Sequence, residues 1–164
     1  SDLIWSVLRD HPTAQGAFMH GFTYSGHQVG AAVAMATLDI MEREDLVRKA
    51  SQTGPYLLSA LRERLADSPF VGDIRGEGLM IGVEYVADRG TRRPFAEAAG
   101  PHRIIARHAF DKGLLTRALP FAPVTSFSPP LTITREEIDR SVDLLAASIE
   151  AAGAELCKLA SVSG

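Results

Sequence analysis

The chain has 164 residues, of which 46% are hydrophobic and 23% are charged, a balance typical of soluble globular proteins. A net charge of −3 without a basic patch argues against nucleic acid as the main partner, and the single cysteine, Cys157, excludes an intrachain disulfide and favours a reducing cytoplasm. No apolar run approaches the roughly 20 residues of a membrane-spanning helix, and the N-terminal residues lack the pattern of a signal peptide.

The first part of the chain predicts a loop followed by a helix. Residues 1–10 are expected to form a short amphipathic turn or helix, and residues 11–24 a loop. A helix should start at Ser25, because Ser25 and Gln28 have the spacing of a capping box, in which the serine bonds forward and the glutamine reaches back. Apolar residues and many alanines then recur at helical spacing to Ile40. So many small residues favour close packing against another element.

A second helix and a strand are predicted next. Leucines at helical spacing predict a helix from Leu46 to Leu65. Pro55 lies inside it and removes one backbone donor, so we expect a kink or a short break near Gly54 and Pro55. Apolar and other residues alternate over 79–85, which predicts a strand with one buried face.

Three glycines surround the start of that strand. Gly76, Gly78 and Gly82 have the spacing GxGxxxG, whereas a dinucleotide-binding loop has GxGxxG and leads into a helix. We therefore interpret them as positions at which the strand passes a crowded neighbour. The sequence contains no P-loop, HExxH or CxxC motif, so it predicts no metal site and no self-contained catalytic site.

The last part of the chain predicts further strands and helices. The expected elements are an exposed loop over 88–101, a helix over 102–112, and short strands over 114–119 and 124–128. A final helix should begin at Thr134, because Thr134 and Glu137 form another capping box. The tail after Gly153 is expected to fray. This order of elements predicts an α+β fold, in which helices cover one face of a small sheet.

Three segments carry a resemblance to one enzyme family. Residues 20–27, HGFTYSGH, are similar to an HG-x-TYSGHP segment, with Gln28 in place of the usual proline. Residues 71–80 resemble a VG-x-VRG-x-GLM strand entry, and residues 128–134 resemble an SPPL-x-IT strand-to-helix turn. These motifs, in this order, are those of class III aminotransferases. These are fold-type-I, pyridoxal-phosphate-dependent enzymes that include the omega-amino acid:pyruvate transaminases.

The resemblance covers only the C-terminal part of such an enzyme, and it implies two domains. Residues 1–57 would be the end of the large cofactor-binding domain, with the loop and the Ala-rich helix as a protruding arm. Residues 58–164 would be the C-terminal small α+β domain. The resemblance further implies a homodimer or a higher homo-oligomer, and we expect self-association through the apolar surface of the arm.

The resemblance also implies roles for three residues. Thr23 matches the threonine that reaches across the dimer interface to the cofactor phosphate of the neighbouring subunit, and Phe22 lies beside it. Backbone N–H groups at a helix start favour such an anion, although an ordinary helix start is the alternative. Arg117 matches the arginine that binds the substrate carboxylate, and the alternative is a surface arginine at a strand end. The chain departs from the family after Arg117, where it reads Ala-Leu-Pro. Arg75 is interpreted as structural.

The lysine that forms the Schiff base with pyridoxal phosphate lies, in the family, just before the segment that matches Ser1 and Asp2. Lys49, Lys112 and Lys158 lie in helical stretches that do not match its motif. Because that lysine supplies the covalent chemistry, we expect this chain alone to be inactive. Its parent would move an amino group from an amine or omega-amino acid donor to a keto acid. The alternatives are a small-molecule-binding or regulatory α+β domain and a non-catalytic dimerisation module.

Overall fold

The computed structural model describes residues 2, 6 and 22–162. The chain divides into two units, of which the first ends at Ile40 and the second begins at Met41. The elements expected over residues 1–10 and 11–24 lie outside the described residues, apart from Asp2, Ser6 and 22–24. The predicted domain boundary after residue 57 and the protruding arm stay predictions.

Helix α2 (Gln28–Arg43) has no buried residue. The close packing that its alanines favoured is therefore absent from the described residues. Its large apolar side chains are exposed instead, and they are Val29, Val33, Met35, Leu38 and Ile40.

The second unit contains a four-stranded antiparallel sheet in the order β1-β2-β4-β3. The strands are β1 (Val71–Glu77), β2 (Met80–Tyr85), β3 (Arg117–Ala118) and β4 (Val124–Phe127). The alternation predicted for β2 is confirmed, because Ile81, Val83 and Tyr85 are buried and the residues between them are not.

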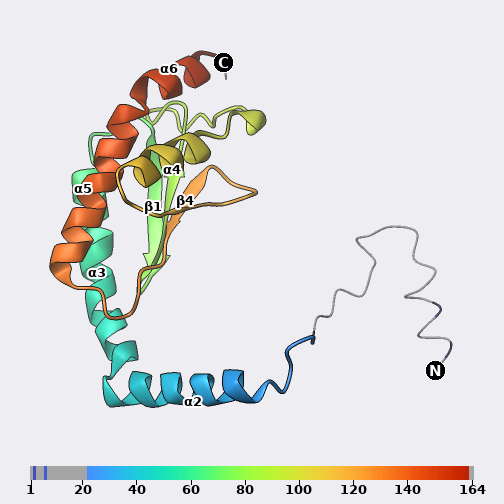
Figure 1. Ribbon diagram of the computed structural model, residues 1–164. Coiled ribbons are helices and arrows are strands. Elements are labelled where there is room, and N and C mark those ends of the chain that lie inside the picture. The colour runs from blue at the N-terminus through green and yellow to red at the C-terminus, as the bar shows by residue number, and fades with distance from the viewer. Residues whose placement is uncertain (1, 3–5, 7–21, 163–164) are drawn as a thin grey trace. The chain divides into compact units, whose positions relative to one another are not determined.

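Helices pack against this sheet to give the α+β fold that the sequence predicts. Helix α3 (Leu46–Arg64) packs on β1 and on α5 (Arg135–Ala151), and α4 (Pro101–Asp111) packs on α5 and β3 (Figure 1). A short 3-10 helix, η2 (Glu97–Ala99), precedes α4. The core between helices and sheet includes fully buried Leu61, Val83, Ile105 and Leu145.

Of the kink or short break expected near Pro55, the break is wrong, because α3 runs through this position as one helix. Leu57 and Leu61 are buried in the core one and two turns beyond Gly54, and their packing outweighs the single lost backbone donor. Gly54 itself lies against the turn between β1 and β2. A Cβ at this position would fall 2.3 Å from the carbonyl oxygen of Gly78.

The interpretation of the glycines near β2 as sites of close approach is confirmed for Gly76 and Gly82 but is wrong for Gly78, which has no atom within 4 Å of the position of a Cβ. Gly78 starts the two-residue turn between β1 and β2 with φ +54°, a conformation that other residues rarely adopt. A Cβ on Gly76 would lie 2.1 Å from the carbonyl oxygen of Met80. These glycines thus shape a hairpin and do not form a nucleotide-binding loop.

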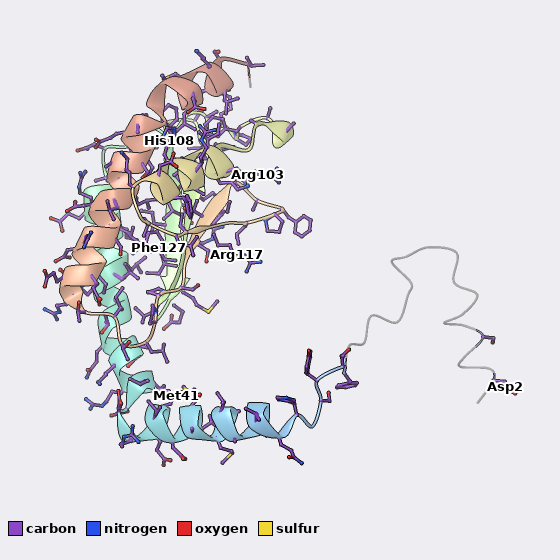
Figure 2. The ribbon with its side chains drawn as sticks, in the orientation of Figure 1. Asp2, Met41, Arg103, His108, Arg117 and Phe127 are labelled. Atoms are coloured by element: carbon purple, nitrogen blue, oxygen red, sulfur yellow. The ribbon has the colours of Figure 1, made fainter. Side chains whose placement is uncertain are left out.

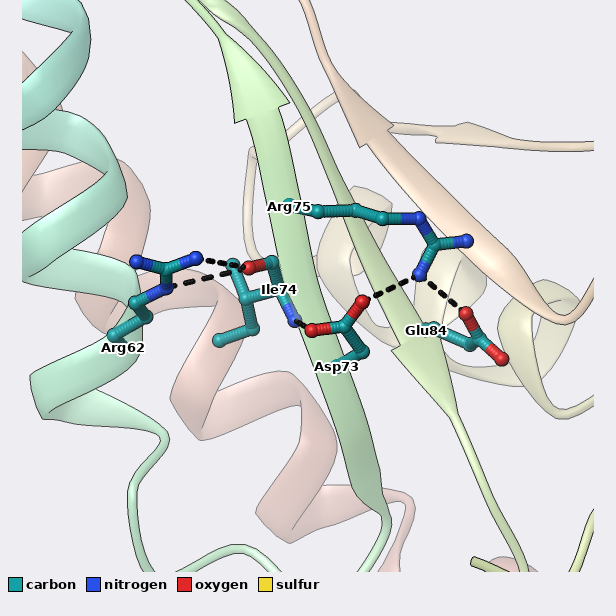
Figure 3. Close-up of polar contacts among 5 residues, drawn as sticks. All are labelled: Arg62, Asp73, Ile74, Arg75 and Glu84. Atoms are coloured by element: carbon teal, nitrogen blue, oxygen red, sulfur yellow. Dashed lines mark hydrogen bonds and ion pairs between the residues drawn. The ribbon is translucent and has the colours of Figure 1, made fainter.

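The structural interpretation of Arg75 agrees with its contacts on the sheet (Figure 3). Its Nη1 lies 2.8 Å from Oδ2 of Asp73 and also contacts Glu84 on β2. The Arg75 hydrogen bond is the main reason why the pKa of Asp73 lies below its usual value. On the other side, Arg62 of α3 donates to the carbonyl oxygen of Ile74 at 2.9 Å and joins the helix to the sheet edge.

The C-terminal part of the unit contains one confirmed and one wrong prediction. The capping box of α5 is present, since the Glu137 N–H donates to Thr134 Oγ1 at 3.2 Å and the Thr134 N–H donates to Glu137 Oε2 at 2.8 Å. The tail after Gly153 does not fray but forms α6 (Gly153–Val162). Leu156 of α6 is fully buried, and this packing stabilises the helix.

Candidate functional site

The segment that the sequence predicts to contact the cofactor phosphate forms a tight turn before α2. The Ser25 N–H donates to the carbonyl oxygen of Phe22 at 3.0 Å, and the His27 N–H donates to that of Tyr24 at 3.2 Å. Gly26 has φ +76°, which allows the chain to reverse here. The turn places all of these residues at the surface.

His27, and not Ser25, caps helix α2. The Gly30 N–H donates to Nδ1 of His27 at 3.1 Å, and the Ala31 N–H donates to the His27 carbonyl oxygen at 2.9 Å. The predicted capping box at Ser25 and Gln28 is therefore wrong. The turn ends at His27, two residues after the helix start predicted at Ser25. The His27 imidazole therefore accepts the capping hydrogen bond that was expected for the Ser25 hydroxyl.

This cap predicts different effects for two neighbouring substitutions. His27→Ala should destabilise the start of α2 by about 1 kcal/mol, because one backbone N–H loses its acceptor. Ser25→Ala should have a much smaller effect and is the matched control. Amide hydrogen exchange at Gly30 and Ala31 measures the difference. Equal exchange in both variants would contradict the assignment of the cap to His27.

Thr23 and Phe22 lie side by side in this turn. Thr23 is exposed, and no hydrogen bond joins its hydroxyl to a residue that the structure describes. Phe22 is 62% exposed, and Tyr24 packs edge-on against the His27 ring at 5.9 Å between centroids. A hydroxyl without a described partner, beside the N-terminus of a 16-residue helix, fits the phosphate end of pyridoxal phosphate.

Arg117 belongs to the other unit, where it begins the short strand β3 (Figure 2). It pairs with Ser126 of β4, and the preceding Thr116 hydroxyl donates to the Ser126 carbonyl oxygen at 3.0 Å. The guanidinium is exposed and forms no ion pair with a side chain in the described part of the chain. A guanidinium in this state can bind a carboxylate through two parallel hydrogen bonds.

The turn after Arg117 is stiff and apolar. It spans residues 119–123 and closes with the Leu119 N–H donating to the carbonyl oxygen of Val124 at 2.9 Å. Pro120 and Pro123 restrict its backbone, and Phe121 at its tip is 98% exposed. This turn includes Leu119 and Pro120, which belong to the stretch where the sequence departs from the family pattern.

His102 is a residue whose position the sequence did not reveal. Its side chain is only 6% exposed, and neither ring nitrogen has a hydrogen-bond partner. The other histidine of α4, His108, bonds through Nε2 to Glu155 of α6 at 2.8 Å. The two histidines are six residues apart, and this spacing gives no indication that His102 is buried.

Three lysines and the possible metal ligands were the other candidates for a reactive centre in the part of the chain that the structure describes. Lys49, Lys112 and Lys158 are exposed and lie in α3, at the end of α4 and in α6. Within the described residues, no three metal-binding side chains cluster. No helix in the described ranges is long and apolar enough to cross a membrane.

Comparison with known proteins identifies the family. The profile of the family described as Aminotransferase class-III matches residues 6–149. This chain belongs to that family.

Aminotransferases of several bacteria are similar to the chain. It is 40% identical over 155 residues to an uncharacterized aminotransferase of Sinorhizobium fredii, covering 94% of this chain and 33% of that protein. It is also 40% identical to a putrescine–pyruvate aminotransferase of Pseudomonas aeruginosa, covering 79% of this chain and 28% of the relative. The chain thus spans about a third of the length of the curated relatives that it matches.

The fold is likewise that of a solved relative. The omega transaminase of Pseudomonas jessenii, solved in complex with PMP, has a TM-score of 0.72 and 40% identity. The match covers 84% of this chain and 30% of that structure.

Proposed function

We propose that this chain is the C-terminal portion of a pyridoxal-phosphate-dependent transaminase. The enzyme moves an amino group from an amine or omega-amino acid donor to a keto acid. The observation that carries this proposal is the family match over residues 6–149, a range that includes both Thr23 and Arg117. The names of the putrescine–pyruvate relative and of the omega transaminase solved with PMP support the reaction and the cofactor.

Thr23 and Phe22 act at the cofactor. When bound, pyridoxal phosphate supplies the electron sink for amino-group transfer. The Thr23 hydroxyl donates a hydrogen bond to the phosphate held by the neighbouring subunit of a homodimer, and Phe22 lines the same place. The exposure of both side chains at the start of α2 supports this role.

Arg117 acts at the substrate. Its guanidinium binds the carboxylate of the keto acid and so orients the carbonyl group for the reaction. The absence of a described ion-pair partner supports this role, because the charge is free to bind a ligand. The stiff turn over 119–123 limits the backbone movement of β3 and keeps the side chain in position.

The chain by itself does not perform the reaction, since none of Lys49, Lys112 and Lys158 matches the lysine that binds the cofactor covalently. The catalytic lysine belongs to the longer protein. The single cysteine of this chain, Cys157, accords with a cytoplasmic location.

The experiment compares Arg117→Gln with wild type in the longer protein. The variant should raise the KM for pyruvate about tenfold, because the carboxylate loses a charged hydrogen bond. The KM for putrescine, which has no carboxylate, should stay near the wild-type value. Arg140→Gln, at another exposed arginine without a described ion pair, is the control. An unchanged KM for pyruvate would overturn the role of Arg117, and transfer by the 164-residue chain alone would overturn its inactivity.

A further inference from the structure

A hollow of about 590 Å³ lies between the start of α4 and the turn over residues 119–123. The apolar side chains in its walls include Phe95, Pro120, Phe121 and Pro123. Two basic side chains, His102 and Arg103, also line it, and no acidic side chain does so among the described residues. Among the side chains that the structure describes, those that line the hollow are therefore apolar or basic.

His102 is the first group in the hollow that is available to bind a ligand. It is 94% buried, lines the hollow, and has no hydrogen-bond partner at either ring nitrogen. Burial lowers the pKa of the His102 imidazole, and the nearby charge of Arg103 lowers it further. The Leu119 backbone opposes this shift, but it does not meet the geometry of a hydrogen bond to either ring nitrogen. A neutral imidazole keeps one N–H donor, and a buried donor without a partner is destabilising.

The start of α4 is the second group. Pro101 is its first residue, and Gly100 before it has φ +58° and provides no side-chain cap. The positive end of the dipole of this 11-residue helix is therefore not compensated by a capping side chain. Arg103, labelled in Figure 2, is exposed and forms no ion pair with a described side chain.

We propose that this hollow binds a small oxyanion, a carboxylate or a phosphate. The anion accepts hydrogen bonds from the His102 imidazole and the Arg103 guanidinium at the N-terminal end of α4. The apolar side chains of the hollow accommodate an apolar group attached to the anion. The site includes neither Thr23 nor Arg117, whose roles are proposed above.

The test is an NMR titration of the 164-residue chain with its histidines labelled with nitrogen-15. Inorganic phosphate and benzoate are the probes, added at neutral pH and constant ionic strength. His102→Gln identifies the His102 signal among the five histidines. We expect that signal to shift saturably, and Arg103→Gln to weaken the binding by about tenfold. Arg140→Gln, an exposed arginine outside the hollow, should bind as wild type does.

The outcomes separate the sources of the anion. Saturation by phosphate alone assigns a phosphate-bearing ligand, and saturation by benzoate alone assigns a carboxylate. Saturation by both supports the oxyanion site without preference. An unshifted His102 signal, or equal affinities of the wild type and Arg103→Gln, would overturn the proposal. Thermal melting of each variant checks that the fold is retained.

Discussion

Replacing Leu156 by alanine should destabilise the unit that begins at Met41 by about 2–5 kcal/mol. The side chain is fully buried and belongs to the main core, so its removal loses apolar contacts and leaves a cavity. Urea unfolding measures the change as a lower midpoint with a similar slope. The size of the effect reflects how strongly α6 is anchored.

Val162→Ala is the matched control for Leu156→Ala. Val162 lies in the same helix but is 80% exposed, so its truncation should change the stability by less than about 0.5 kcal/mol. Should Leu156→Ala unfold at the same urea concentration as the wild type, α6 would not be packed in solution, and the fraying that the sequence suggests would be correct after all.

Replacing Thr23 by alanine in the longer protein should weaken the retention of pyridoxal phosphate by roughly ten- to a hundredfold. A hydrogen bond to a charged group contributes ~1.5–3 kcal/mol, and 1.4 kcal/mol corresponds to a factor of ten. The Thr23 hydroxyl has no hydrogen bond within the described chain, so its removal costs no internal contact. Cofactor titration by fluorescence measures the affinity, and thermal melting measures the fold.

Ser25→Ala provides the comparison for Thr23→Ala. Both substitutions remove one exposed hydroxyl from the same turn, and His27 provides the cap of α2 in either case. The serine variant should therefore retain the cofactor nearly as the wild type does. If the two variants bind equally well, Thr23 does not contact the phosphate and the segment is only the start of a helix.

The elements with a regular pattern could be predicted from the sequence. Strand β2 follows from its alternation, and the start of α5 follows from the capping box at Thr134. Strand β1 has no such pattern, because Gly72 and Gly76 interrupt it and its pairing with β2 defines it. Helix α6 depends on burial of Leu156 and on the bonds of Glu155 to α4, contacts between residues far apart in the sequence.

The candidate site divides in the same way. Phe22, Thr23 and Arg117 could be selected by their resemblance to the family, although their roles stay predictions. The cap by His27 could not be predicted, because the capping pattern specifies a hydroxyl or carboxylate and here a ring nitrogen accepts the bond. The burial of His102 could not be predicted, because it results from the fold of the 119–123 turn beside α4 and not from local spacing.

The sheet has two edge strands, and neither is suited to pairing with a strand of another chain. Strand β3 has only two residues, which is too short a template for pairing with a second chain. Strand β1 carries exposed Asp73 and Arg75, and its pairing register shifts between Val71 and Asp73, a local irregularity that hinders edge-to-edge aggregation. If copies of this chain associate, we therefore expect contacts between side chains, such as the exposed apolar ones of α2, and not pairing of edge strands.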